Sequence, residues 1–527
     1  MSQIDVIKEV VRYEQLLREN STNHVLKGEY LIRDSQYPDM KEVLGVDSKA
    51  TITNKEVLGD KVMVEGQLVY IVFYLPKDEV ITDSPTNKIH SVIFTDKFAN
   101  YLDLNSDEHN IICDVECEIE HIEANWMNER KVGIDGVLTL KWEMYKNGEF
   151  EYVKDIEGKE DIQIKKKDEM LNSVKGEKEI DLMGKSMLKV TMDKPEIEEI
   201  LKCSMNVHKK EIKLVEDKVY IGCYCKIEIL YKGKENKELI TLQDDVYLSK
   251  EEEMPGISGD MISSLNLNIK DQQYAINLDD LGENRVVDVE FVIRGNVKVY
   301  SKDKIEMLKD AYSPTMNIDI SKDEKEFGAI HSVNNVEATA KDNVELKNSD
   351  ERIEQIISVM GNPIITDKMV DDDKVKVEGI VKTAIIYKVA GEELGYGIIT
   401  GEIPFITAAD VKGAKKGMNA LVKVSLESID ASIEGNSISV KANVGLTIKV
   451  CYKVKKECVT DVIEGPSEVK EKKSSVTIYV VGQDDTLWDL AKKYNTTMDE
   501  LNRLNELEGN ENIKSGDKLI IPGRALF

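Results

Sequence analysis

The sequence predicts a multidomain, mainly β protein in which three tandem β-rich domains precede a small C-terminal βααβ domain. The length of 527 residues is enough for several domains. One motif occurs three times at nearly constant spacing, and the composition changes after Ile463. Apolar residues make up 41% of the chain, which supplies ordinary hydrophobic cores.

The repeated motif is Asp-Lys-Val, and its spacings of 157 and 156 residues are those of whole domains. The three copies begin at Asp60, Asp217 and Asp373. A tyrosine follows each aspartate by 14 positions, at Tyr74, Tyr231 and Tyr387. The motif therefore marks the same element in three copies of one domain.

Alternating apolar residues follow the motif and predict a strand with one buried face. In the first copy this face holds Val62, Val64, Gly66, Leu68, Tyr70, Val72 and Tyr74. The other two copies keep the same register between Val219 and Tyr231 and between Val375 and Tyr387. A slip of one residue would turn the whole apolar set to solvent, so the register must be kept.

Other elements are predicted around this strand. Residues 38–44, 195–201 and 351–357 have apolar spacings near three and four, which favour a short helix in each copy. Late alternating strands are predicted at residues 132–142, 286–300 and 438–450. Pro404 marks an edge strand or a strand end, because proline cannot donate to a central ladder.

These patterns divide the chain into domains and linkers. We expect an N-terminal helix and a first β domain within residues 1–156, a second β domain at 180–320 and a third at 336–463. The charged segments 157–179 and 301–335 are expected to be linkers or peripheral helices. Residues 464–475 form a polar linker to the C-terminal domain, residues 476–527.

The C-terminal domain has clear start and stop signals. Residues 477–481 alternate as a strand, and Leu519 to Pro522 form a second one. Thr486 is placed to cap a first helix, and Thr497 with Glu500 forms a capping box for a second. The predicted order is βααβ.

This domain resembles a LysM domain at residues 479–481, 485–491, 494–497, 501, 504–505, 512–513, 516 and 519–522. LysM domains bind N-acetylglucosamine polymers in a shallow groove between the loop before the first helix and the loop after the second. The resemblance implies binding of such a polymer or of a partner by Asp484, Asp485, Thr486, Leu487, Trp488, Asn512 and Ile513. Asp484 departs from the family, which usually has glycine there. For Trp488, packing under the helices and anchoring a partner are equally supported.

Three such repeats followed by one LysM domain resemble the SipL-like family of spore coat morphogenetic proteins, whose repeats are SPOCS domains. The resemblance implies a non-enzymatic scaffold that acts in the mother-cell cytoplasm and is recruited to the forespore surface. Its LysM domain would bind a SpoIVA-like coat ATPase, and other coat proteins would be further partners. The alternative is a structural protein of the spore envelope that binds peptidoglycan or another N-acetylglucosamine polymer.

Charge and cysteine content agree with a protein partner in a reducing compartment. The net charge of −28 opposes binding to nucleic acid or anionic lipid. The densest basic run, Lys165 to Lys167, is flanked by acidic residues and is expected to be a solvated loop. Seven irregularly spaced cysteines argue against a disulfide framework. No secretory signal and no membrane-spanning segment are predicted.

No catalytic, cofactor or metal site is predicted. Gly184, Lys185 and Ser186 lack the second glycine of a phosphate-binding loop and favour a turn. Cys223 and Cys225 lie on the apolar face of the repeat strand and are expected in the core. The aspartates 371–373 favour a solvated hairpin turn over a Ca²⁺ site. The richest potential ligand cluster, which we still expect to be structural, contains Cys113, Cys117, His109 and His121.

Overall fold

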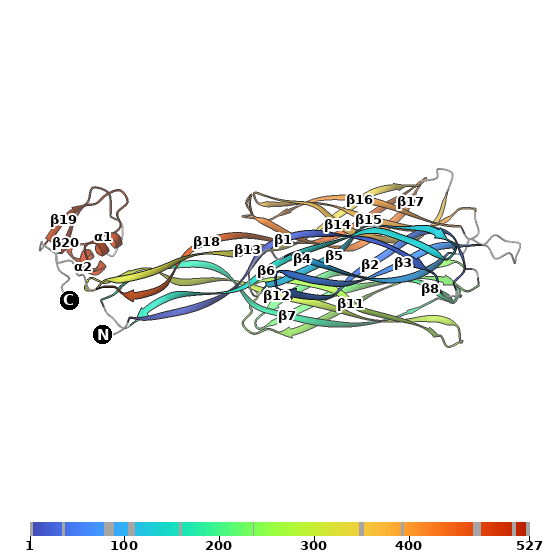
Figure 1. The fold of residues 1–527 in the computed structure, drawn as a ribbon, viewed down its shortest axis with the longest axis horizontal. Helices are drawn as coiled ribbons and strands as arrows, with labels where there is room; N and C mark the ends of the chain where they lie inside the picture. The colour runs from blue at the N-terminus through green and yellow to red at the C-terminus, as the bar shows by residue number, and fades with distance from the viewer. Residues whose placement is uncertain are drawn as a thin grey trace.

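The computed structural model describes residues 4–33, 37–77, 89–103, 111–157, 161–235, 237–346, 352–391, 395–466, 476–507 and 513–522. The molecule is elongated (Figure 1). Three β sandwiches lie side by side at one end, long strands leave them as a stalk, and the small helical domain lies at the far end of the stalk.

Each sandwich is one repeat unit of six strands in two three-stranded antiparallel sheets. In every unit the sixth strand pairs with both the first and the fifth, while the second, third and fourth strands form the other sheet. The first unit contains β1 (Asp5–Leu31), β2 (Met40–Leu58), β3 (Lys61–Pro76), β4 (His90–Asp103), β5 (Ile111–Asn128) and β6 (Lys131–Glu157). The second contains β7 (Gln163–Lys189), β8 (Ile197–Val215), β9 (Lys218–Gly233), β10 (Leu239–Glu253), β11 (Ile262–Leu278) and β12 (Asn284–Tyr312). The third contains β13 (Ile318–Glu345), β14 (Ile353–Asp371), β15 (Lys374–Val389), β16 (Tyr396–Asp410), β17 (Asn419–Glu434) and β18 (Ser437–Glu464).

The core of each unit lies between its two sheets, and the repeat strand is central to it. The predicted apolar faces of β3, β9 and β15 are buried, which confirms the strand and its register. The motif tyrosines also have a clear role in two units. The hydroxyl of Tyr74 donates to the backbone oxygen of Pro38 at 3.1 Å, and Tyr231 donates to Pro195 at 3.2 Å. Each bond ties the end of the strand to the segment before its neighbour.

The short helices predicted before these strands are wrong, because β2, β8 and β14 occupy those segments. The register of β2 against β3 shifts between Met40 and Glu42 and again between Val43 and Gly45. Each shift is a bulge that places two residues opposite one, so residues three apart face the same side. Met40 and Val43 both pack in the first core for this reason. β8 and β14 have matching shifts, and a bulged strand therefore gave the spacing of a helix.

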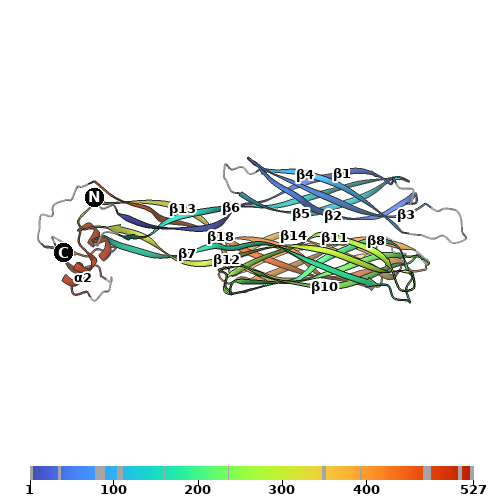
Figure 2. The same cartoon turned by 90° about the horizontal axis from the view of Figure 1, so that it is seen from below.

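The predicted N-terminal helix and the predicted linkers 157–179 and 301–335 are also wrong. β1, β7 and β13 are the first strands of the three units, and each pairs along its whole length with the sixth strand of the same unit. These strands are 27 to 29 residues long and extend beyond the sandwiches as three two-stranded ribbons (Figure 2). The ribbons pack on one another and form the stalk.

The stalk has an approximate threefold repeat. Tyr152, Met307 and Cys458 occupy equivalent positions in the sixth strands and share one buried cluster. A second bulge falls at the same place in every ribbon, at Lys154, Lys309 and Thr460. Because bulges bend and twist a strand, repeating one at the same position lets three ribbons converge on a common apolar axis.

The sandwiches form a closed ring around this axis. The hydroxyl of Ser91 in the first unit donates to Leu201 O of the second at 3.0 Å, and Thr241 of the second donates to Ile357 O of the third at 2.7 Å. At the remaining junction Ile398 of the third unit lies in the same apolar cluster as Leu44 of the first. The fourth strand of each unit thus contacts the second strand of the next.

Several smaller expectations can now be compared with the structure. Pro404 lies in β16, an edge strand, as predicted. Cys223 and Cys225 are fully buried in the second core, which confirms their apolar role. The turn predicted at residues 184–186 is wrong, because they lie within β7 and Gly184 has the ring of Phe291 directly over it.

Candidate functional site

The C-terminal domain has the predicted βααβ order. Its elements are β19 (Val476–Val480), α1 (Leu487–Lys493), α2 (Met498–Leu504) and β20 (Lys518–Pro522), and β19 pairs with β20. The Thr486 hydroxyl accepts from Asp489 N at 3.1 Å, and the Thr497 hydroxyl accepts from Glu500 N at 3.1 Å. Both helices therefore begin at the predicted caps, which satisfy backbone donors left free in the first turn.

Most residues predicted for a glycan or partner site also hold this domain together. The Asp485 carboxylate accepts from Gly482 N at 2.7 Å and from the Tyr479 hydroxyl at 2.9 Å, and these hydrogen bonds lower its pKa. Leu487 is buried in the domain core, and Ile513 packs against that core. Since Thr486 caps α1, four of the seven predicted side chains are engaged within the domain.

Two further predicted residues differ from this group. Asp484 is exposed in the loop before α1 and leaves a carboxylate facing solvent. Asn512 lies outside the described residues. The described part of the predicted groove therefore presents one acidic side chain, where glycine would let a ligand approach the backbone.

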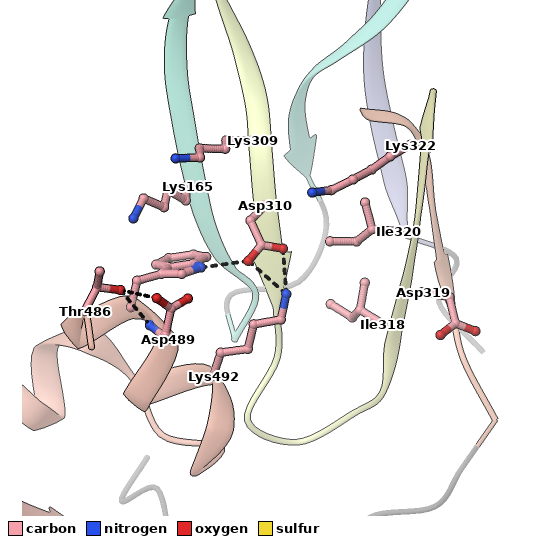
Figure 3. Close-up of a pocket in the computed structure, with 11 residues that line it drawn as sticks. Lys165, Lys309, Asp310, Ile318, Asp319, Ile320, Lys322, Thr486, Asp489 and Lys492 are labelled. Atoms are coloured by element: carbon pink, nitrogen blue, oxygen red, sulfur yellow. Dashed lines mark hydrogen bonds and ion pairs between the residues drawn. The ribbon is translucent and has the colours of Figure 1, made fainter. Parts of the chain in front are cut away.

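Trp488 contacts another part of the chain. Its side chain is 6% exposed, and its indole Nε1 donates to Asp310 Oδ2 at 2.8 Å. Figure 3 shows the Asp310 carboxylate directed toward Lys492 of α1. The Tyr312 ring meets the indole edge-to-face, with centroids 4.9 Å apart and an angle of 77°. Both partners belong to the end of β12 in the stalk. Trp488 lies in the buried cluster of its own domain, as the packing alternative expects. The indole also anchors the LysM-like domain to the chain's own second unit, which neither sequence-based alternative included.

Asp310 is the polar centre of the contact. Its two carboxylate oxygens accept from Lys492 Nζ at 2.6 and 2.8 Å. Burial raises the pKa of Asp310, but the hydrogen bonds from Lys492 and Trp488 and the lysine charge outweigh it, so the pKa lies below its ordinary value. The ionised carboxylate is therefore the form that holds the domain in place.

The position of Asp310 follows from the repeat. Asp155, Asp310 and Asp461 each follow the common bulge of the stalk, and each accepts from the next backbone N–H. Their spacings of 155 and 151 residues are visible in the sequence. This repeat was a signal that sequence reasoning missed, although nothing in it shows which of the three aspartates meets the C-terminal domain.

Further contacts fix the domain on the same ribbon. The Tyr312 hydroxyl donates to Thr496 O at 2.8 Å, and the Tyr312 ring belongs to the apolar cluster of the C-terminal domain. Met498 N donates to the side-chain oxygen of Gln163 at 3.4 Å. The domain is covalently attached after β18 of the third unit, yet it docks on β7 and β12 of the second.

A pocket of about 500 Å³ lies beside this contact. Its walls are α1, the paired ends of β7 and β12, and the start of β13. The residues that line it are Lys165, Lys309, Asp310, Ile318, Asp319, Ile320, Lys322, Thr486, Trp488, Asp489 and Lys492.

The basic run at 165–167 takes part in this region, so the predicted solvated loop is wrong. All three lysines lie in β7. Lys165 Nζ lies 5.7 Å from the centroid of the Trp488 ring. Lys166 forms an ion pair with Asp155 at 2.9 Å, and Lys167 donates to Glu457 O at 2.9 Å. The run therefore connects all three ribbons and the docked domain.

The opposite side of the C-terminal domain carries an uncovered aliphatic face. Val476, Ile478 and Val480 alternate along β19 and are 57%, 70% and 57% exposed. Ile520 of β20 pairs with Ile478 and is 43% exposed, and Lys518 lies opposite Val480. We call Val476, Ile478, Val480 and Ile520 the aliphatic face. Apolar side chains gathered in this way on a surface usually mark an interaction site.

The described residues contain no group of three or more side chains placed to hold a metal ion. Burial raises the pKa of both Cys113 and Cys117 to about 11, so neither thiol is ionised near neutral pH. His121 is exposed beside Glu123, and His109 lies outside the described residues. In the segment 371–373, where a hairpin turn was favoured over a Ca²⁺ site, Asp373 accepts from Gly413 N at 2.6 Å and Asp371 forms an ion pair with Lys416 at 3.3 Å. No helix among the described residues is long and apolar enough to cross a membrane.

Comparison with known families identifies both parts of the chain. The model for the SipL SPOCS domain matches residues 39–127, 196–277 and 352–434, and the LysM domain model matches residues 479–522. Each SPOCS match runs from the second to the fifth strand of a unit and omits the two strands that form the stalk. The matches indicate a sporulation-related protein built from binding domains, with a peptidoglycan-binding-like module at its end. Comparisons with curated proteins and with solved structures gave no match.

Proposed function

Because the chain has the SipL-like architecture of three SPOCS domains followed by a LysM domain, we propose that it is a non-enzymatic scaffold of spore coat assembly. In this proposal it acts in the mother-cell cytoplasm and on the forespore surface. Its LysM domain binds a SpoIVA-like coat ATPase, and the SPOCS units hold that domain at a defined distance from other coat proteins.

The observation that supports this proposal best is the aliphatic face of the LysM domain. Trp488 and Tyr312 already cover one side of the domain, whereas Ile478 and its neighbours remain exposed. Burying a large aliphatic side chain contributes about 1.5–3 kcal/mol. A flat sheet face of this kind suits an apolar surface of a protein better than a hydroxyl-rich sugar chain.

The rod-like body also suits a scaffold. Ion pairs cross between units at Lys202 and Asp47, 2.7 Å apart, and at Lys423 and Glu116, also 2.7 Å apart. The hydrogen bonds of Ser91 and Thr241 join further units. These contacts link all three units into one body. Because the LysM domain docks on the second unit, a partner held by any unit keeps a fixed position relative to a partner held by the LysM domain.

The test is binding of purified coat ATPase to the full-length chain, measured by biolayer interferometry. Ile478→Glu places a charge in the aliphatic face, and we expect at least a tenfold loss of affinity. Ile406→Glu is the matched control, because Ile406 is 65% exposed on an edge strand of the third unit. Equal affinity of the Ile478→Glu variant and the wild type would reject this surface as the docking site.

The LysM match supports a second candidate, binding of an N-acetylglucosamine polymer. The exposed Asp484 beside the expected groove would weaken it, since a carboxylate replaces the usual glycine. Sedimentation of the full-length chain with insoluble peptidoglycan tests this function. Saturable binding at physiological salt that increases in the Asp484→Gly variant and persists in Ile478→Glu would favour the glycan.

A further inference from the structure

The pocket between the stalk and the LysM domain is a composite of three parts of the chain. Thr486, Trp488, Asp489 and Lys492 come from the LysM domain, and the other lining residues come from the second and third units. Its volume of about 500 Å³ falls within the roughly 300–1,000 Å³ typical of ligand sites. The pocket exists only while the LysM domain is docked, because α1 supplies one wall.

Lysines line much of this pocket although the chain carries a net charge of −28. Four of the lining residues are lysines and three are aspartates. Lys492 is paired with Asp310, and Lys322 is paired with Glu457 at 2.8 Å. Lys165 and Lys309 have no carboxylate partner among the residues that the structure describes. Two ammonium groups are thus free to meet an anion.

An aliphatic wall faces these lysines. Ile318 and Ile320 are half-buried at the start of β13 and pack against the stalk core. Figure 3 shows them on the side of the pocket opposite Lys165 and Lys309. A ligand that fills the pocket therefore meets ammonium groups on one side and methyl groups on the other.

We propose that this composite pocket binds a peptide segment of a partner protein in which a carboxylate side chain lies next to an aliphatic one. The carboxylate meets Lys165 and Lys309, and the aliphatic side chain packs on Ile318 and Ile320. Asp319 and Asp489 also line the pocket and would repel a polyanionic phosphate ligand more strongly than a single carboxylate. No arginine, which prefers bidentate phosphate recognition, lines the pocket.

This site goes beyond the proposed function, because it requires neither the coat ATPase nor the aliphatic face. It also depends on docking. A ligand that contacts both walls stabilises the docked LysM domain, since a ligand favours the state that it binds. Occupancy of the pocket would therefore make the position of the LysM domain on the stalk more rigid.

The test uses the full-length chain with ¹⁵N-labelled tryptophan and the synthetic pentapeptide acetyl-Leu-Glu-Leu-Glu-Leu-amide as the probe. Trp488 lines the pocket, so its indole N–H resonance reports binding. We expect saturable shifts of that resonance, an affinity at least tenfold lower for the peptide with Gln in place of Glu, and a similar loss in the Lys309→Gln variant. Lys309 forms no hydrogen bond or ion pair with the described part of the LysM domain, so we expect this variant to leave docking intact.

The control is Lys154→Gln, which changes the lysine at the equivalent bulge of the first unit, where it pairs with Glu9. It should bind the peptide like the wild type, and so should Ile478→Glu. Equal affinity for the Glu and Gln peptides, equal affinity of Lys309→Gln and the wild type, or an unmoved Trp488 resonance would each overturn the proposal. None of these outcomes affects the test of the coat ATPase.

Discussion

Replacement of Asp310 by asparagine should release the LysM domain from the stalk. Asp310 accepts two bonds from Lys492 and one from the Trp488 indole. Asparagine retains an oxygen for the N–H of Ala311, which keeps the local backbone bond of the bulge. It has no charge for Lys492, so the substitution acts on the contact between the domains rather than on the strand.

The size of the effect follows from exposure and charge. The Lys492 side chain is 42% exposed, so loss of its ion pair should cost about 0.5–1 kcal/mol. With the asparagine oxygen at the Oδ1 position, the amide NH₂ replaces Oδ2 and cannot accept from the indole, so this hydrogen bond is lost at a cost of about 1–3 kcal/mol. The sum of about 1.5–4 kcal/mol lowers the ratio of docked to undocked molecules roughly tenfold to a thousandfold.

The assay compares the indole N–H resonances of the three tryptophans in the full-length chain. Trp126 and Trp142 lie in the first unit and serve as internal references. We expect a second, solvent-like Trp488 population in Asp310→Asn. Asp461→Asn is the matched control, because Asp461 follows the equivalent bulge in the third unit and, among the residues that the structure describes, forms no hydrogen bond or ion pair with the LysM domain.

Two results would refute the reasoning. The first is an unchanged Trp488 resonance in Asp310→Asn, which would mean that the apolar contact with Tyr312 alone holds the domain. The second is the same change in Asp310→Asn and Asp461→Asn, which would assign the effect to the stalk rather than to the contact.

Three other predictions concern pH, packing and thiol reactivity. The docked state lowers the pKa of Asp310 below its ordinary value of about 3.9. The carboxylate should therefore contribute fully to docking above that value and lose its contribution as the pH falls through the lowered pKa; a Trp488 signal that stays constant on acidification from pH 6 to about 2 would contradict this. Gly66→Val should lower the free energy of unfolding, measured by urea denaturation, by about 1–3 kcal/mol, because a Cβ at this position would lie 2.2 Å from the Phe98 ring. Gln67→Val, on the exposed side of the same strand, should change this free energy little. Burial raises the pKa of the Cys223 thiol to about 11 and that of Cys225 to about 12, so neither should react with Ellman's reagent at pH 8 until the chain unfolds; fast reaction in the native state would show that the second core opens.

Much of each unit was predictable because its signals are local. Strict alternation from Val62 to Tyr74 specifies a half-buried strand wherever the strand lies, and the three copies repeat it. The caps Thr486 and Thr497 act within one helical turn, so the LysM-like elements could also be placed. The short helices were predicted wrongly because a bulge changed the period, as at Met40 and Val43; the stalk strands were missed because their charged, mixed sequences bury their apolar residues only against other units.

The candidate site was less predictable, because its partners are far apart in the chain. Trp488 and Asp310 are separated by 178 positions. Sequence patterns identify an apolar residue that needs burial, but not the surface that buries it. Asp485 and Thr486 were assigned to a binding loop, whereas their short-range hydrogen bonds within the domain engage them.

The sequence by itself determined the three repeats, the buried face of their central strands and the order of the C-terminal elements, because each depends on periodicity or capping within a few residues. Tertiary structure alone decided that the outer strands of the units form a common stalk, that the units close into a ring, and that the LysM domain docks on the second ribbon rather than on the unit to which it is attached. These features depend on contacts between equivalent positions of the three units, which meet around the axis of the stalk. A residue at one such position carries no local sign of which copy it will contact, so only the packed molecule distinguishes Asp310 from Asp155 and Asp461.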